Sequence, residues 1–193
     1  MSQALDRQEA FETPAPPQSG NAPSDATIAA LSGDRPLRIL LPSYRSNPTT
    51  GGQGVYMRHI SKALVDLGHT VDVISGPPYP DLDPRVGLIK LPSLDLYANP
   101  HPIRAFRPWM LTSPIDLFEW WSHNWGGFSE PYTFGERMAR YMQGRIHEYD
   151  VMHDNQTLCW GMLKVRDMGL PVVGTIHHPI TMDKRIDIKH MPG

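Results

Sequence analysis

The sequence predicts an α/β fold built on a doubly wound, mainly parallel, Rossmann-like sheet, and two observations lead to that prediction. Short apolar runs alternate with segments of helical periodicity from residue 37 onward. Within residues 37–75 the order is strand, helix, strand, which joins two parallel strands through a right-handed crossover. A chain of 193 residues is long enough for one such domain and short for two.

Five strands and four helices are expected. In chain order they are a strand at 37–42, a helix at 56–67, strands at 70–75 and 86–92, helices at 114–122 and 132–147, a strand at 149–154, a helix at 158–168 and a strand at 171–178. The strands are short apolar runs, and the third follows the proline-broken loop 77–84.

Each helix is assigned from the spacing of its apolar residues and from its ends. The first ends at Gly68 and the last at Gly169, because glycine often follows the final turn of a helix. Ser113 and Pro114 stand as the cap and first residue of the second helix. The predicted apolar faces are Tyr56, Ile60, Ala63, Leu64 and Leu67 in the first helix, and Phe134, Met138, Met142 and Ile146 in the third.

The chain divides into a tail and a folded domain. Residues 1–34 are predicted to be disordered, because their prolines stand among small polar residues that bury too little apolar surface. Residues 35–193 form the domain, with a tryptophan-rich helical insertion near 97–135. The sequence stops after the last predicted strand without a closing helix, so a truncated domain is expected.

Composition restricts the partners and the location. The 18 basic and 20 acidic residues nearly cancel, which argues against a nucleic-acid surface. Cys159 is the single cysteine and forms no internal disulfide, which fits a reducing compartment. No apolar run has the length of a leader peptide or a membrane span. A cytoplasmic location is therefore expected.

Three glycines, Gly51, Gly52 and Gly54, precede the first helix in the loop where ligands of open parallel sheets bind. The start of a helix favours an anion such as phosphate, and glycine lets it approach the main chain. The alternative is a loop that needs glycine only for its backbone conformation. A Walker loop is excluded, because no Gly-Lys is followed by Ser or Thr.

A nicotinamide or flavin enzyme is also disfavoured. Met57 stands where the dinucleotide fingerprint requires its third glycine. The second strand ends in Ser75 and Gly76, where that fingerprint requires an acidic residue for the ribose hydroxyls.

Three segments, in order, are similar to the N-terminal half of a family 4 glycosyltransferase. They are residues 37–75 with the glycine loop, the strand end "YDVMHDNQ" and the strand "LPVVGTIHH", which together cover roughly 37 to 180. The resemblance implies a retaining enzyme of the two-domain GT-B fold. Such an enzyme transfers a hexose from a nucleotide diphosphate sugar to a sugar or lipid-linked acceptor, without a cofactor.

The resemblance also implies roles for individual residues. Gly51 and Gly52 would face the donor diphosphate, while Gly54 is better explained by entry into the helix. His177 would be the catalytic residue beside the donor sugar or acceptor, with one imidazole nitrogen on a hydroxyl and the other held by the backbone. His153 and Asp154 would contact acceptor hydroxyls, and a solvated strand end is the equal alternative for both.

Three basic residues lie near the glycine loop. Arg45 is the candidate for the donor phosphate, whereas Arg58 and Lys62 at i, i+4 are typical of a solvated helix face. No metal site is expected, because His177 and its neighbour His178 point to opposite faces of a strand.

The insertion mixes Arg104 and Arg107 with tryptophans. Such a mixture suits peripheral contact with the inner face of a membrane, or an acceptor pocket with aromatic walls. The simpler hypothesis is that Ile115, Phe118 and Trp121 pack on the sheet.

The resembling enzymes take most donor contacts from a C-terminal domain, and none of that domain is recognisable here. The chain alone is therefore expected to be inactive until a donor domain completes it. The alternative is a non-catalytic module that uses the half-site for binding or regulation.

Overall fold

The computed structural model describes residues 35–49, 52–157 and 159–177. The predicted tail at 1–34, the candidate phosphate ligand Gly51 and the segment from His178 to the end of the chain lie outside the described residues. The folded domain begins at Pro36.

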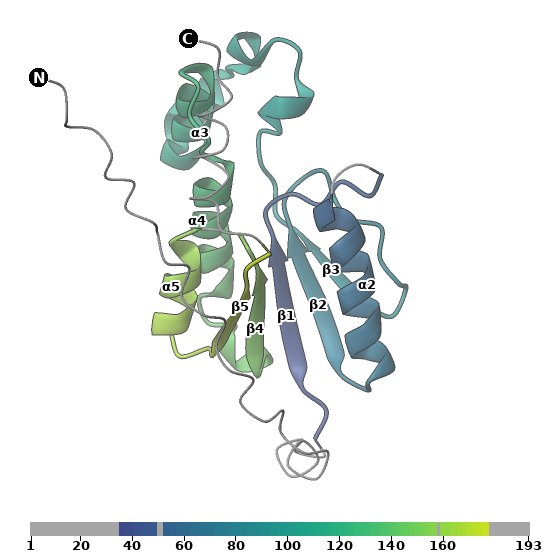
Figure 1. Cartoon of the computed structure of the whole chain (residues 1–193). Helices are drawn as coiled ribbons and strands as arrows, with labels where there is room; N and C mark the ends of the chain where they lie inside the picture. The colour runs from purple at the N-terminus through teal and green to yellow at the C-terminus, as the bar shows by residue number, and fades with distance from the viewer. Residues whose placement is uncertain (1–34, 50–51, 158, 178–193) are drawn as a thin grey trace, which may run out of the picture. The chain divides into compact units, whose positions relative to one another are not determined.

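A five-stranded parallel sheet forms the centre of the domain (Figure 1). Its strands are β1 (Arg38–Ser43), β2 (Thr70–Ser75), β3 (Gly87–Lys90), β4 (Val151–Asn155) and β5 (Val172–Thr175). They lie in the order β3-β2-β1-β4-β5. The predicted α/β class and the parallel sheet are confirmed.

Helices cover both faces of the sheet, as a doubly wound fold requires (Figure 1). On one face lies α2 (Gly52–Asp66), and on the other lie α4 (Glu130–Met142) and α5 (Gly161–Asp167). The remaining helix, α3 (Pro114–Asn124), belongs to the tryptophan-rich insertion. Four 3₁₀ turns complete the described elements: Leu96–Ala98, Pro102–Ala105, Pro108–Thr112 and Ile146–Glu148.

Strand β1 supplies both halves of the core, because alternate side chains of a strand point to opposite faces. Leu40 packs with α4 and α5, whereas Ile39 and Leu41 pack with α2. All three are at most 5% exposed. A continuous apolar run is what burial on both faces demands, so this strand was recognisable from sequence.

The first helix starts earlier than predicted, and its most buried residues lie beside the predicted apolar face. Tyr56, Ile60 and Leu64 of that face are partly buried and pack against the core. The buried residues of the helix are Gly54, Met57 and Ser61, of which Met57 is fully buried. Leu67, placed on the predicted apolar face, is 73% exposed. Small residues at the contact let the helix lie close to the sheet, which an analysis of apolar spacing does not register.

Two other helices end differently from the prediction. Phe134, Met138 and Met142 are buried as expected, but α4 stops at Met142, and Ile146 lies in a separate 3₁₀ turn. Gly144, with φ of 76°, breaks the helix between them. Helix α5 begins only at Gly161, although the expected helix began at residue 158.

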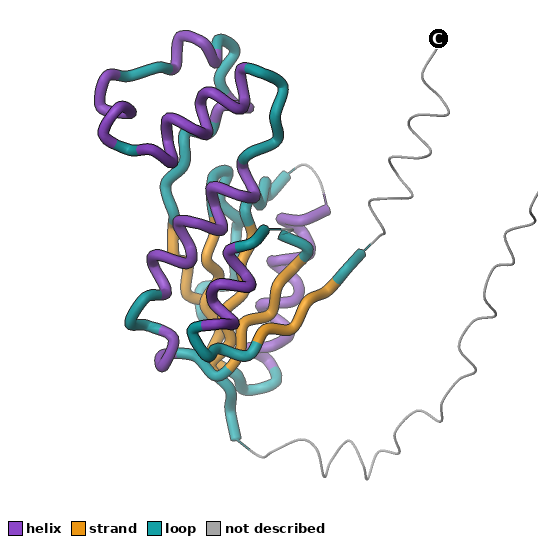
Figure 2. Tube along the Cα trace, turned by 90° about the vertical axis from the view of Figure 1, so that its left-hand side faces the viewer, coloured by secondary structure: helices purple, strands orange, loops and turns teal. Residues whose placement is uncertain are grey.

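The insertion does not pack on the sheet, so that expectation is wrong. Phe118 and Trp121 are 41% and 53% exposed. Figure 2 shows the helical insertion beyond the ends of the strands, where α3 contacts its neighbouring 3₁₀ turns and α4. The buried side chain of α3 is Glu119, which does not belong to the predicted apolar face.

Charged side chains hold the insertion to α4. Arg137 of α4 forms ion pairs with Asp116 at 2.5 Å and with Glu119 at 2.6 Å. Glu119 is 1% exposed, and its Oε1 also accepts the Leu94 backbone N–H at 3.1 Å. A buried carboxylate with partners from two segments fixes α3 in position, because losing either partner leaves a charge without compensation.

Cys159 lies partly buried against the core cluster of α4 and α5, as expected for a small core residue. Burial raises the pKa of its thiol to about 11.

The loop after β1 passes very close to the start of α2. The Ser46 backbone N–H donates to the Pro78 carbonyl at 3.0 Å, which anchors the loop. A Cβ placed on Gly54 would lie 2.0 Å from the Asn47 carbonyl oxygen, whereas one on Gly52 would meet no atom within 4 Å. Gly54 is therefore required by packing, in agreement with its assignment to helix entry.

This contrast predicts opposite outcomes for two matched substitutions. Gly54→Ala forces the 46–47 backbone to move and should lower the free energy of unfolding by about 1–3 kcal/mol. Gly52→Ala enters open space in the first helical turn and should be neutral or slightly stabilising. Urea denaturation of both variants checks this, and equal losses of stability would contradict it.

Candidate functional site

The candidate site lies at the carboxyl edge of the sheet, where β1 and β4 are neighbours. The chain leaves β1 toward α2 on one face and leaves β4 toward α5 on the other. Loops that depart in opposite directions from adjacent strands leave room between them, and ligands of such sheets bind at this switch point.

His177 follows β5 at this edge, and residues from two other elements hold it. Its Nε2 lies 2.5 Å from Oδ1 of Asn155, the last residue of β4. Its backbone N–H donates to Oε1 of Gln156 at 2.9 Å. The ring of Tyr56 in α2 packs edge-on against the imidazole, with 4.7 Å between centroids. The expectation of a backbone partner for the ring is wrong, because a side-chain amide takes that place.

Gln156 adopts a left-handed backbone conformation with φ of 50°, which is uncommon outside glycine. The residue is 7% exposed, and its side chain turns toward the start of the segment that follows β5. This conformation ends β4 and brings the Gln156 amide against the His177 backbone.

The two acceptor-binding candidates make local contacts at the end of β4. His153 Nε2 lies 2.7 Å from the Thr175 hydroxyl of β5, and burial lowers the pKa of this histidine. The Asp154 carboxylate accepts the Thr157 backbone N–H at 3.2 Å and the Thr157 hydroxyl, and burial raises the pKa of Asp154. These contacts support the strand end, and acceptor binding by either residue remains a proposal.

The start of α2 offers Gly52 as exposed main chain. Arg45, proposed for the phosphate, instead places its guanidinium 3.5 Å from Oε2 of Glu130 at the start of α4. Glu130 is 8% exposed and lines a small hollow together with Tyr44, Phe134 and Arg137. Burial raises the pKa of Glu130 to about 7, although the Arg45 charge opposes that rise.

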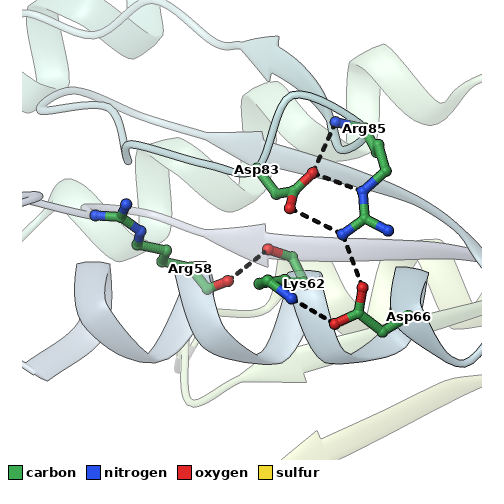
Figure 3. A network of polar contacts seen from close by, with 6 residues as sticks. Arg58, Lys62, Asp66, Asp83 and Arg85 are labelled. Carbon is green, nitrogen blue, oxygen red and sulfur yellow. Dashed lines mark hydrogen bonds and ion pairs between the residues drawn. The ribbon is translucent and has the colours of Figure 1, made fainter.

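The other two basic candidates lie in a surface network on α2 (Figure 3). Lys62 pairs with Asp66 at 2.5 Å, and Arg85 links Asp66 to Asp83. These cations hold the pKa values of both carboxyls below their usual range. Arg58 pairs with Asp81 at 3.2 Å, so the solvated helix face expected for Arg58 and Lys62 is what the structure shows.

Three side chains around His177 were not singled out from sequence: Tyr56, Asn155 and Gln156. For two of them the sequence did carry a signal, the polar pair Asn155 and Gln156 at the end of the apolar strand β4. Within the described ranges, no three His, Cys, Asp or Glu side chains gather closely enough to hold a metal ion. No helix in those ranges is long and apolar enough to cross a membrane.

The fold agrees with what comparison with known proteins shows. The model of Glycosyltransferase Family 4 matches residues 50–192, which is more than half of the chain. The chain therefore belongs to Glycosyltransferase Family 4.

Two individual proteins are similar to this chain over part of their length. The chain is 52% identical over 153 residues to the MMP alpha-(1->4)-mannosyltransferase of Mycolicibacterium hassiacum. That match covers 79% of this chain but 37% of the relative, so the chain spans little more than a third of the relative's length. A crystal structure of LpCGTa in complex with UDP is similar at a TM-score of 0.38 and 16% identity, over 72% of this chain and 30% of that one.

Glu130 should make stability depend on pH. Its pKa rises from 4.5 to about 7 on folding, so its stabilising contribution is fully present below about pH 4.5 and is lost as pH rises through about 7. Up to about 3 kcal/mol is involved, because each pKa unit corresponds to about 1.4 kcal/mol. Glu130→Gln should remove this slope in urea denaturation measured from about pH 4.5 to 8.

The matched control is Glu148→Gln, which changes an exposed carboxylate. Its pH profile should parallel that of the wild type. A Glu130→Gln profile with the wild-type slope would show that Glu130 is not the titrating group.

Proposed function

We propose that this chain is the acceptor-side N-terminal domain of a retaining hexosyltransferase. The hexose is mannose, taken from a nucleotide diphosphate sugar and passed to a sugar or lipid-linked acceptor with its anomeric configuration retained. The single observation that supports the choice of mannose is the 52% identity to a named mannosyltransferase.

The site geometry supports separate binding roles for the residues at the carboxyl edge of the sheet. Gly52 presents main chain at the positive end of α2, which suits the diphosphate. His177 stands at the end of β5 with its ring oriented by neighbours, which suits a sugar hydroxyl. His153 and Asp154 lie on the neighbouring strand β4, and we assign them to the acceptor hydroxyls.

The proposal includes dependence on a second domain. The mannosyltransferase relative extends well beyond the matched part, and the described residues supply few cations for a leaving diphosphate. Arg45, Arg58 and Lys62 all pair with carboxylates of this chain. We therefore assign stabilisation of the leaving group to a C-terminal donor domain. A non-catalytic binding or regulatory module is the second candidate, and the same experiment separates the two.

The test mixes this chain with the unmatched C-terminal part of the Mycolicibacterium hassiacum relative and measures transfer from GDP-mannose and UDP-mannose. Transfer should appear only in the mixture. His177→Ala should lower the rate by roughly 100-fold, while Lys62→Ala, which changes an exposed surface pair, should not. Transfer by the isolated chain, or none in a mixture shown to associate, would overturn the proposal.

The insertion supports a further part of the proposal, peripheral contact with the inner face of a membrane. Its exposed apolar side chains include Ile103, Trp109, Leu111, Trp121 and Trp125, the last 78% exposed. Arg104 and Arg107 are exposed in the same segment. Aromatic rings beside cations suit the headgroup layer of an anionic bilayer.

Flotation with anionic liposomes tests this contact. The chain should rise with the vesicles at low salt, and the double substitution of Trp121→Ser and Trp125→Ser should abolish most of that association. Trp160→Ser is the control, because Trp160 is 69% exposed but lies just before α5, outside the insertion. Absence of flotation by the wild type would remove the membrane contact.

A further inference from the structure

We propose that Asn155, backed by Met57, is a positioning residue that holds His177 in the form protonated on Nε2. His177 then offers the lone pair of Nδ1, and the ligand group at this point must be a hydrogen-bond donor. This inference rests on the proposed function only for the identity of that ligand.

The orientation of the Asn155 amide follows from its two neighbours. Asn155 is 2% exposed, so both ends of its amide must be satisfied within the protein. Its Nδ2 lies 3.6 Å from the Met57 thioether, and a thioether sulfur accepts hydrogen bonds but cannot donate them. The NH₂ group therefore belongs beside the sulfur, and the carbonyl Oδ1 faces His177.

The tautomer of His177 follows from that orientation. A carbonyl oxygen only accepts, so the imidazole nitrogen 2.5 Å away must carry a proton. In a neutral imidazole the other nitrogen, Nδ1, is then an acceptor. Among the described residues, no hydrogen bond to Nδ1 is found.

Three contacts keep the ring from turning over. The Gln156 amide holds the His177 backbone, the Tyr56 ring packs on one side of the imidazole, and Asn155 holds Nε2. Met57 is fully buried, so the thioether that sets the amide has little freedom to move.

The chemistry of the ligand is restricted as a result. A sugar hydroxyl can donate to Nδ1, whereas a fully ionised phosphate oxygen has no proton to give. His177 therefore suits the sugar ring, and a diphosphate is directed elsewhere, to the start of α2. Neutral His177 also has no proton on Nδ1 to give to a leaving group.

The test is a long-range ¹H–¹⁵N correlation spectrum of the histidine side chains at about pH 8, where neutral imidazole prevails. His177→Gln assigns its signals among the nine histidines. The expected result is a protonated Nε2, an unprotonated Nδ1, and a Nε2–H proton protected from exchange with water. His177 protonated on Nδ1 would overturn the inference.

Variants separate positioning from a general loss of structure. Asn155→Leu removes the acceptor, so the protected Nε2–H signal should be lost, whereas Asn155→Asp keeps an acceptor oxygen and should retain it. Met57→Leu frees the amide to rotate and should weaken the signal. Met138→Leu, a fully buried methionine of the other core cluster, is the control and should leave it unchanged.

Each outcome is decisive even if one variant does not fold. Should Asn155→Leu be unfolded, the wild-type spectrum and the Met57→Leu variant still test the tautomer. Retention of a full Nε2–H signal in folded Asn155→Leu would overturn the positioning role of Asn155, and retention in Met57→Leu would overturn the part assigned to the Met57 thioether.

Titration with ligands tests the second half of the inference. Methyl α-mannoside or GDP-mannose should shift the Nδ1 resonance of His177, and pyrophosphate alone should not. An equal shift with pyrophosphate would overturn the ligand assignment. If no probe shifts Nδ1, the ligand assignment fails, while transfer in the two-domain mixture still decides the proposed function and the ligand-free spectrum still decides the tautomer.

Discussion

The parallel pairing of β1 with β4 is the constraint on which the remaining structure depends. Ile39 and Leu40 pair with Val151 and Met152, strand residues more than a hundred positions away in the chain. This pairing puts the two loops that leave in opposite directions next to each other. The parallel sense of the strands brings their polar carboxyl ends to one edge. Without it, the start of α2 and the end of β4 would not meet.

In the candidate site the same residues serve both core packing and polar contacts. Met57 fills the core between α2 and the sheet, and its sulfur also satisfies a buried amide. Asn155 ends a strand and also holds an imidazole. Because a buried amide without partners is costly, the core contact and the ring orientation cannot be varied separately.

Local patterns account for what the sequence predicted correctly. Buried parallel strands are short apolar runs, and helix ends carry Gly68, Gly169 and Pro114, so the order of elements and the sheet class were accessible. The side-chain contacts of the candidate site could not be predicted from the sequence. Asn155 and Met57 are 98 positions apart, and a polar residue after a strand has the same local pattern whether it faces water or a histidine. The packing of the insertion was mispredicted for a related reason: the apolar spacing of α3 does not reveal that its buried side chain is Glu119, paired with Arg137 of α4.

The state of Cys159 has a practical consequence for labelling experiments. With a thiol pKa of about 11, almost none of it is present as the reactive thiolate at neutral pH. A cysteine introduced at an exposed position of the insertion would therefore react with maleimide dyes well ahead of the native one. Distances between the insertion and the proposed donor domain become measurable by fluorescence without first replacing Cys159.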